Sequence, residues 1–449
     1  MKPRKVEAKA FLEFLELAEK YKPFQVAKRI VYRKYGLLGS RFDKVTTSIV
    51  YKMYRLQGIL DYIIRSRAGV DPERLPSALR QYLRLAVYLA QFDEVKDVEF
   101  SEYLVGYMRR VALARFRPAD AELIESVYRG LLRRPWTPSS RMERMMLELL
   151  LPPLLIEYLA ELLPSSELKR FAEYVNTNRP LLGLRVNRLK ASLEEVLEEV
   201  RAQGVEAWPS ERVPFHIVYR GGLDYESLRA LREGKAVPQD EASAAAAFLL
   251  GPRPGSRAAD LTAAPGGKAT HMAELMEARG LLVAFEIYHD RALHMRDLAA
   301  RVGVMHMVHV VQADARLAPA ILGRERFDYV LLDPPCTSTG AIAKHPEARW
   351  RLTREAVKKH VKLQRELLEA AYQILRPGGR LLYSVCSVIP DEGEHNITWF
   401  LESHSDMVLV PLRGPYDPSP LLPGAMRAWP HRHGTTGFFY ALLEKKPRG

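Results

Sequence analysis

Five short apolar runs in the second half of the chain are separated by stretches with helical spacing. The runs are RAADLT, LLVAFE, HVVQAD, FDYVLLD and RLLYSV, and the helical patterns begin near Lys268, His289, Arg354 and Asp391. Regular alternation of this kind is typical of parallel strands, because each parallel connection needs a crossover that is usually a helix. We therefore predict a doubly wound α/β domain over residues 239–449, with ligands bound at the carboxyl ends of its strands.

The first 238 residues have two other patterns. From residue 6 to about 164, apolar residues recur at helical spacing and alternating β-branched runs are scarce, which predicts an all-α domain over residues 1–164. Residues 165–238 contain the strand-like runs LLGLRVN and HIVYRGG around the amphipathic pattern SLEEVLEEVRAQG. We predict a small α+β linker domain there. A chain of 449 residues is long enough for three domains of ordinary size.

The charge of the chain is positive and unevenly distributed. The formal net charge is +13, and residues 1–164 hold 29 Lys and Arg against 20 Asp and Glu. Segments such as YMRRVALARFRPAD and VYRGLLRRPW place aromatic residues among arginines. A single arginine is more often part of a solvated helix face, but their concentration in one region favours a polyanionic partner. We expect this region to bind RNA.

Hydropathy and cysteine content exclude several classes of protein. No apolar run approaches the roughly 18 residues of a membrane span, and glutamates interrupt the N-terminal segment where a signal peptide would be apolar. The chain has two cysteines and no CxxC pair, and its histidines do not form a HExxH frame. We expect a cytoplasmic monomer with no metal site and no membrane contact.

The first of the five strands leads into a loop that suits a nucleotide-like ligand. In DLTAAPGGKATHM, residues 260–272, two glycines connect the strand to a helix whose N-terminus offers free N–H groups. The spacing is not GxGxxG, so this loop alone is as typical of a tight structural turn. The following strands end at or just before Glu286, Asp314 and Asp333. Acids at the tips of successive strands favour a pocket for a nucleoside cofactor.

The two cysteines occupy equivalent positions. Cys336 follows DPP after the fourth strand, and Cys386 lies at the end of the fifth strand, in YSVCS. An isolated cysteine is usually a small buried hydrophobic residue. Here, however, both cysteines lie where the carboxyl ends of strands meet, so we expect them to share one site.

Taken together, DLTAAPGGK, LLDPPCTSTG and YSVCS resemble the motifs of RNA cytosine-C5 methyltransferases of the Sun/RsmB type. The resemblance covers roughly residues 165–445 and includes LRVNRLK, PQDEAS and GTTGFFYALLEKK. The N-terminal region resembles the NusB-like RNA-binding domain of the RsmB branch. The resemblance implies a Rossmann-like class I methyltransferase domain that uses S-adenosylmethionine to methylate RNA, with ribosomal RNA favoured over transfer RNA.

The resemblance also implies roles for individual residues. Cys386 would attack C6 of cytosine, and Cys336 would assist release of the methylated product. Asp333 would contact the edge of the base, and Lys268 would favour the thiolate and orient Asp333. The residues implied to hold the cofactor are Thr262, Ala263, Ala264, Pro265, Gly266, Gly267, Lys268, Glu286, Arg291, Asp314 and Asp333. Thr262 and Val385 depart from the family pattern, which has Cys and Thr at these positions.

Two alternatives and one further motif complete the sequence-based predictions. A methyltransferase-like RNA-binding or assembly factor would not need Lys268, Asp333 and both cysteines. A methyltransferase acting on an exocyclic nitrogen would have an aromatic residue after Pro-Pro, where this chain has Cys336. The acids of PDEGEHN, residues 390–396, stand at a predicted helix start, where the helix dipole favours them. We expect them to cap that helix rather than to take part in catalysis.

Overall fold

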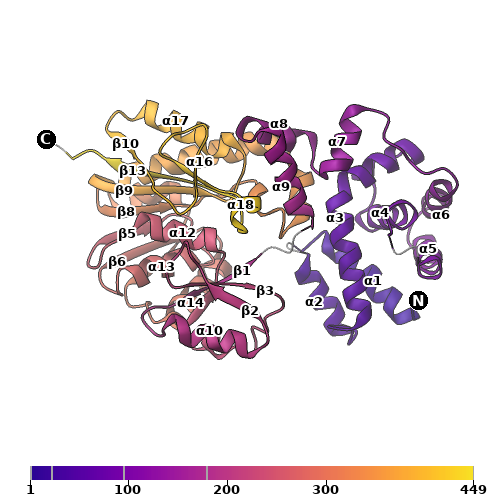
Figure 1. Cartoon of the computed structure of the whole chain (residues 1–449), viewed down its shortest axis with the longest axis horizontal. Helices are drawn as coiled ribbons and strands as arrows, with labels where there is room; N and C mark the ends of the chain where they lie inside the picture. The colour runs from indigo at the N-terminus through magenta and orange to yellow at the C-terminus, as the bar shows by residue number, and fades with distance from the viewer. Residues whose placement is uncertain (1–2, 22–23, 95–96, 178–180, 448–449) are drawn as a thin grey trace. The chain divides into compact units, whose positions relative to one another are not determined.

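A computed structural model describes residues 3–21, 24–94, 97–177 and 181–447. The chain forms two compact units (Figure 1). One contains residues 1–153 and 345–350, and the other contains residues 154–344 and 351–449. Among the described residues, no helix combines the length and the apolar character needed to cross a membrane.

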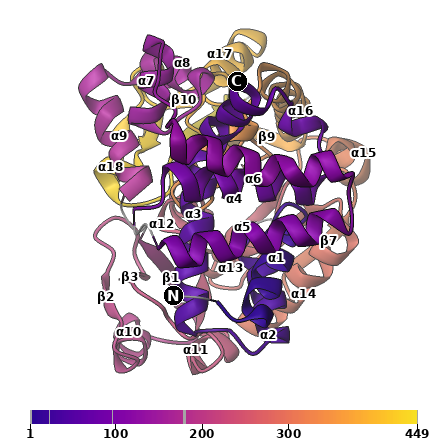
Figure 2. The ribbon, with the colours of Figure 1, turned by 90° about the vertical axis from the view of Figure 1, so that its right-hand side faces the viewer.

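The first unit is helical, as the apolar spacing predicted. Its main helices are α1 (Lys5–Ala18), α2 (Gln25–Lys34), α3 (Arg41–Ala68), α4 (Ser77–Gln91), α5 (Val98–Leu113), α6 (Pro118–Arg133) and α7 (Arg141–Leu149). Helices α5 and α6 lie side by side (Figure 2). The longest helix, α3, begins where the Ser40 side chain accepts a hydrogen bond from the Asp43 amide, and it ends at Gly69 in the left-handed conformation.

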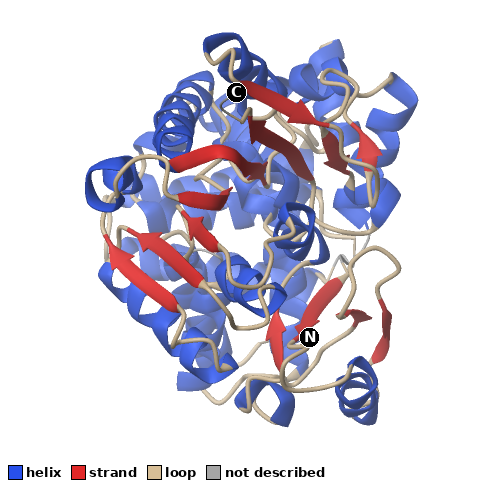
Figure 3. Cartoon of the chain, turned by 90° about the vertical axis from the view of Figure 1, so that its left-hand side faces the viewer, coloured by secondary structure: helices blue, strands red, loops and turns tan. Residues whose placement is uncertain are grey.

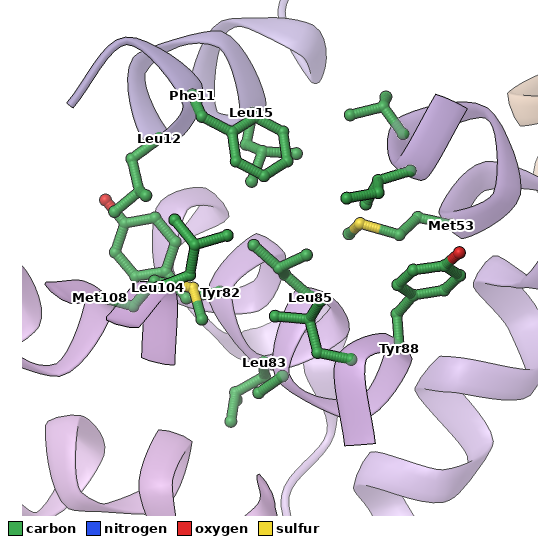
Figure 4. Packing of buried hydrophobic residues seen from close by; sticks show 14 of the residues in the cluster. Phe11, Leu12, Leu15, Met53, Tyr82, Leu83, Leu85, Tyr88, Leu104 and Met108 are labelled. Atoms are coloured by element: carbon green, nitrogen blue, oxygen red, sulfur yellow. The ribbon is translucent and has the colours of Figure 1, made fainter. Parts of the chain in front are cut away.

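The helices of the first unit enclose a continuous apolar core. Phe11 of α1, Tyr82 and Leu85 of α4, and Met108 of α5 are almost completely buried and lie around a common centre (Figure 4). Burial of a large apolar side chain contributes roughly 1.5–3 kcal/mol. The clustered residues from several helices therefore contribute much of the stability of this unit.

A segment distant in sequence completes the first unit. The Trp350 indole donates a hydrogen bond of 3.0 Å to the carbonyl of Arg55, and a Cβ atom on Gly58 would lie 2.2 Å from the Trp350 ring. The Arg349 guanidinium is fully buried and donates to the Leu150 carbonyl at 2.7 Å. Residues 345–350 are therefore an integral part of the helical unit, although helices α1–α7 all precede residue 150.

The second unit begins with two helices and a small sheet. The helices are α8 (Pro153–Leu162) and α9 (Ser165–Thr177), and the strands are β1 (Leu182–Val186), β2 (Glu206–Pro209), β3 (His216–Arg220) and β4 (Ala236–Pro238), with α10 (Leu193–Ala202) and α11 (Arg229–Arg232). The strands pair in the order β2-β3-β1-β4, and each neighbouring pair is antiparallel. The two strands and the helix predicted from LLGLRVN, HIVYRGG and SLEEVLEEVRAQG are confirmed as β1, β3 and α10. Helix α9, β2 and β4 were not predicted.

Among the residues that the structure describes, the large sheet of the second unit has nine strands. They are β5 (Arg257–Asp260), β6 (Leu281–Glu286), β7 (Val308–Gln312), β8 (Phe327–Leu332), β9 (Leu375–Val385), β10 (Met407–Val410), β11 (Asp417–Pro418), β12 (Met426–Ala428) and β13 (Phe438–Lys445). The helices associated with it are α12 (Glu241–Leu250), α13 (Gly267–Leu275), α14 (His289–Val302), α15 (Ala318–Leu322), α16 (Arg354–Ile374), α17 (Glu394–Ser403) and α18 (Pro430–His433). Helices cover both faces of the sheet (Figure 3).

The order of the strands in the large sheet indicates where a ligand would bind. The order is β11-β12-β13-β9-β8-β5-β6-β7, with β10 paired to β13. Strands β5 to β9 are parallel, while β13 runs antiparallel to β9. The predicted doubly wound α/β domain is confirmed, with an antiparallel extension that was not predicted. The chain reverses direction across the sheet between β5 and β8, so the crevice at their carboxyl ends is where such a fold binds ligands.

Candidate active site

The two cysteines meet beside this crevice. Cys336 lies in the loop after β8, and Cys386 follows β9 directly. Their Sγ atoms are 3.4 Å apart, both thiols are free, and both residues are partly exposed. The predicted proximity of the two cysteines is confirmed, because β8 and β9 are neighbours in parallel register.

The two thiols differ in their electrostatic surroundings. The hydrogen bond from Cys336 to Cys386, together with burial, raises the pKa of Cys336 well above its ordinary value. The same hydrogen bond lowers the pKa of Cys386, aided by the Ser338 hydroxyl and the Lys268 ammonium, although burial and the Asp333 charge oppose the change. Cys386 is therefore the thiol that ionises first, and the thiolate is the nucleophilic form of cysteine.

An ion pair lies next to Cys386. The Lys268 Nζ atom is 2.6 Å from Asp333 Oδ2, and the Ser384 hydroxyl donates to Asp333 Oδ1 at 2.9 Å. Burial lowers the pKa of Lys268, but the Asp333 carboxylate outweighs it and the pKa lies above its ordinary value. The ammonium therefore stays charged beside the thiol, as the sequence-based role for Lys268 requires.

Two hydrogen bonds fix Thr262 in the loop after β5. The Thr262 hydroxyl accepts a hydrogen bond of 3.2 Å from the Asp333 amide, so the threonine that replaces the family cysteine links the first loop to the fourth. The Asp260 side chain at the end of β5 is 1% exposed, and burial raises its pKa to about 7. Its Oδ1 atom accepts from the Thr262 amide, whereas Oδ2 has no hydrogen-bond partner among the described residues.

An arginine of the small sheet supports the same loop. Arg185 of β1 is fully buried and donates to the Gly267 carbonyl, the Thr270 hydroxyl at 2.9 Å and the Glu274 carboxylate at 2.8 Å. A fourth bond runs from Arg185 to the Gln239 side chain. Sequence reasoning did not single out Arg185. Its position within LRVNRLK was the only signal.

The remaining predicted cofactor residues lie at neighbouring strand ends. Glu286, the last residue of β6, accepts a hydrogen bond from the Tyr288 amide at 2.9 Å and lies 3.3 Å from Arg291. Arg291 also donates to the Ala264 carbonyl at 2.9 Å, so it joins Glu286 to the β5 loop. Asp314 follows β7 and pairs with Arg316 at 2.6 Å, which lowers the pKa of Asp314.

This arrangement fits S-adenosylmethionine. Gly266 has a φ of 102° and precedes α13, whose N-terminus has no side-chain cap. A Cβ atom there would approach Met295 to 3.0 Å, so glycine keeps the loop close to α14. Free N–H groups suit a carboxylate, and the carboxylate of Glu286 at the tip of the next strand suits ribose hydroxyls. The loop residues Thr262 to Lys268 therefore lie where a fold of this kind would hold the cofactor.

The prediction for the acids of PDEGEHN was wrong for Glu392. Helix α17 begins after Gly393, and no side chain caps it. Glu392 lies in a 3₁₀ turn, is fully buried, and accepts hydrogen bonds from Thr337 and Ser387, the residues that follow the two cysteines. Sequence proximity to a helix start suggested capping, but the fold turns this carboxylate toward residues distant in sequence.

Proteins similar to this chain are named as methyltransferases, in agreement with the arrangement of the site. Residues 247–444 match the family model described as 16S rRNA methyltransferase RsmB/F. Ribosomal RNA small subunit methyltransferase B of Pectobacterium carotovorum (strain PC1) is 34% identical over 270 residues, which are 60% of this chain and 61% of that protein. The chain thus spans about three fifths of that relative. The protein of the same name from Salmonella paratyphi B is 32% identical over 331 residues, 74% of each chain.

Two solved structures extend the likeness to the fold. The structure of PH0851 superimposes with a TM-score of 0.89 at 40% identity and covers 99% of this chain and 100% of that one. The structure of NSun6 from Pyrococcus horikoshii, solved with the S-adenosylmethionine analogue SFG, has a TM-score of 0.61 at 25% identity and covers 66% of this chain and 99% of that one. On these matches, the chain belongs to the RsmB/F family of S-adenosylmethionine-dependent methyltransferases.

Proposed function

We propose that the protein methylates C5 of a cytosine in RNA, with ribosomal RNA favoured over transfer RNA, through a covalent bond between Cys386 and C6 of the base. The observation that carries the proposal is the contact of the two sulfur atoms, 3.4 Å apart, beside the Lys268–Asp333 ion pair. A nucleophilic thiol, a second thiol and a partly buried ion pair close to one another are what this chemistry needs.

The chemistry explains why a cysteine is required. C5 of cytosine is too weak a nucleophile to take a methyl group, but addition of a thiolate to C6 makes C5 an enamine carbon. In the proposed first step, the electron pair on Cys386 Sγ forms a bond to C6. The C5–C6 π electrons shift toward N3, which takes up a proton. S-adenosylmethionine, when bound, supplies the methyl group as a sulfonium electrophile.

Release reverses the addition. The C5 proton leaves to a base, its bonding pair restores the C5–C6 double bond, and the C6–S bonding pair returns to Cys386. Cys336 would assist this step, because its protonated thiol donates a hydrogen bond to the departing sulfur. Asp333 would contact the base edge and help to protonate N3, held in place by Lys268 and Ser384.

The residues proposed to bind the cofactor come from the carboxyl ends of neighbouring strands. We propose that the backbone of Thr262, Ala263, Ala264, Pro265, Gly266, Gly267 and Lys268 binds the methionine moiety, with Asp333 beside it. Glu286 would bind the ribose hydroxyls, and Asp314 the adenine amine. Arg291 would act mainly by linking Glu286 to the Ala264 carbonyl.

The choice of substrate rests on charge and on the relatives. The relatives that match are named ribosomal RNA small subunit methyltransferases. The excess of positive charge in residues 1–164 supports RNA binding by the helical region. The NusB-like character of that region, the division at residues 164 and 238, the cytoplasmic location and the monomeric state remain predictions.

The proposal is tested by trapping the covalent bond. Purified protein, small-subunit ribosomal RNA and S-adenosylmethionine are mixed, and the products are separated on a denaturing gel and mapped for 5-methylcytosine by bisulfite sequencing. Cys386→Ala should abolish both the methyl mark and the protein–RNA adduct. Cys336→Ala should accumulate the adduct, because release is slowed.

Three outcomes would contradict parts of the proposal. Methylation by Cys386→Ala would exclude Cys386 as the nucleophile. An adduct trapped by Cys386→Ala but absent from Cys336→Ala would assign the nucleophile to Cys336 instead. A methyl mark on an exocyclic nitrogen, with neither cysteine needed, would replace C5 chemistry altogether.

A further inference from the structure

One buried carboxylate joins the two loops that hold the cysteines. Glu392 Oε1 accepts hydrogen bonds from the Thr337 amide at 2.9 Å and from the Gln364 amide group at 3.2 Å. Glu392 Oε2 accepts from the hydroxyls of Thr337 and Ser387, each at 2.6 Å. Thr337 directly follows Cys336, and Ser387 directly follows Cys386. A single side chain therefore fixes the backbone next to both thiols.

The carboxylate is itself held in place. Glu392 is fully buried, and its carbonyl accepts a hydrogen bond of 2.7 Å from the Tyr383 hydroxyl. Gln364, also fully buried, donates to the Pro335 carbonyl at 3.0 Å and accepts from Asn396 at 2.8 Å. Four acceptor contacts use the full capacity of two carboxylate oxygens and suit the charged, acceptor-only form.

The charge of Glu392 acts unequally on the two cysteines. It adds to the effects of the Cys386 hydrogen bond and of burial in raising the pKa of Cys336. Cys386 instead is influenced by Asp333, Ser338 and Lys268. The network thus places a negative charge on the Cys336 side of the sulfur pair, while the Cys386 side faces both members of the Lys268–Asp333 ion pair.

We propose that Glu392 is a positioning residue that keeps the two sulfur atoms in contact and keeps Cys336 as a neutral thiol, so that Cys386 alone becomes the nucleophile. The positioning role stands on the contacts of Glu392 with Thr337 and Ser387 and on its charge near Cys336, whereas its catalytic meaning rests on the proposed function. A merely structural carboxylate would stabilise the loops without distinguishing one sulfur from the other.

Two substitutions at Glu392 separate the effect of its charge from the effect of its side-chain length. Glu392→Gln removes the charge and can keep the contacts. Its oxygen can take the two N–H donors, and its amide can face the hydroxyls of Thr337 and Ser387, which can turn to accept. Glu392→Asp keeps the charge, but it is one methylene shorter and cannot reach both loops equally. Asp391→Asn is the matched control, since it removes the same charge from a partly exposed neighbour that contacts His395 and Tyr158.

The test measures each thiol separately, without RNA or cofactor. Cys386→Ala leaves only Cys336, and Cys336→Ala leaves only Cys386. The rate of alkylation by iodoacetamide is followed from pH 6 to 10, with the urea-unfolded protein as reference. In the protein with only Cys336, Glu392→Gln should speed alkylation about tenfold at pH 8, because loss of the negative charge lowers the pKa of Cys336. In the protein with only Cys386, the change should stay below about twofold.

In the protein with both cysteines, the rate of disulfide formation measures whether Glu392 positions the two sulfur atoms. Diamide oxidises two adjacent thiols to a disulfide and takes up their two hydrogens. Glu392→Asp should slow this reaction at least tenfold, whereas Glu392→Gln and Asp391→Asn should not slow it. Unfolding transitions and near-ultraviolet circular dichroism check that each variant is folded.

The outcomes distinguish this proposal from the proposed function. Equal changes in both cysteines, no change with Glu392→Gln, or disulfide formation that is insensitive to Glu392→Asp would overturn it. If the thiol measurements agree but no protein–RNA adduct forms, the proposed function fails while the role of Glu392 in setting the thiols stands.

Discussion

The sulfur atoms of Cys336 and Cys386 lie 3.4 Å apart, although 50 residues separate them in the chain. The hydrogen bond between the two thiols lowers the pKa of Cys386 and raises that of Cys336. Ser338 and Lys268 add to the first change, against burial and Asp333, while burial and Glu392 add to the second. Two chemically identical side chains thus differ in how readily they lose a proton.

Replacing Lys268 with Met should slow the reaction of Cys386. The ammonium lowers the pKa of this thiol, so its loss raises the pKa and reduces the thiolate fraction near pH 7.5. We expect alkylation of Cys386 in the Cys336→Ala protein to slow about tenfold, for a change of about one pKa unit. Lys344→Met is the control, because Lys344 forms an equally buried pair with Asp240 away from the cysteines. An unchanged rate in Lys268→Met would show that Lys268 does not tune the thiol.

Replacing Asp260 with Asn should stabilise the protein in a pH-dependent way. Burial raises the pKa of Asp260 to about 7 in the folded state, while in the unfolded chain it is near 3.8. The folded state therefore holds this proton more tightly, and the wild type loses stability as the pH rises from about 4 to about 7. The advantage of Asp260→Asn should be small at pH 4 and about 4 kcal/mol at pH 8. Urea unfolding at both pH values measures it. An advantage that does not grow with pH would contradict the raised pKa.

Removing the buried guanidinium of Arg185 should destabilise the second unit. Arg185→Met leaves the Glu274 carboxylate, 1% exposed, without its charged partner, which costs about 3–5 kcal/mol. The double variant Arg185→Met/Glu274→Met should recover most of this loss, since no buried charge is then left unpaired. Chemical unfolding of the single and double variants measures both values. Affinity for S-adenosylmethionine should fall in both, because the Gly267 carbonyl loses its donor. A double variant as unstable as the single one would show that packing, not charge, dominates.

The packing of Trp350 against Gly58 can be tested with two helical glycines. In Gly58→Ala the new methyl group would overlap the indole ring, so the ring must move, at a cost of about 1–3 kcal/mol. Gly130→Ala in α6 meets no atom within 4 Å and should stabilise the unit by about 0.5–1 kcal/mol. Thermal unfolding measures both effects, and tryptophan fluorescence should change only in Gly58→Ala. Equal effects of the two substitutions would exclude the overlap.

The sequence predicts the parallel strands and the meeting of the cysteines because both depend on local patterns. Apolar runs alternate with helical spacing, and each cysteine stands where a run ends. The role of Glu392 depends instead on Thr337, 55 residues away, which no local pattern reports. The same holds for Arg185 and Gly267, 82 residues apart.

Short strands were missed for a related reason. Strand β12 (Met426–Ala428) has three residues and β4 (Ala236–Pro238) also has three, too few for alternation to be recognised. Their pairing with β13 and β1 determines them, so tertiary contacts rather than propensity decide their conformation. Thr262 is a third kind of case. Its hydroxyl accepts a hydrogen bond from the Asp333 amide, 71 residues away, which no local pattern reports.

The segment of residues 345–350 changes how the chain can be divided. A shortened protein beginning at residue 154 would carry an indole and a guanidinium that are normally covered by helices it no longer has. Its solubility would suffer from that exposed surface, whatever the state of the catalytic sheet. An independent catalytic fragment therefore requires a second cut, with residues 345–350 replaced by a short polar bridge. Conversely, the helical part can be isolated intact only if this six-residue peptide is supplied with it, for instance in trans.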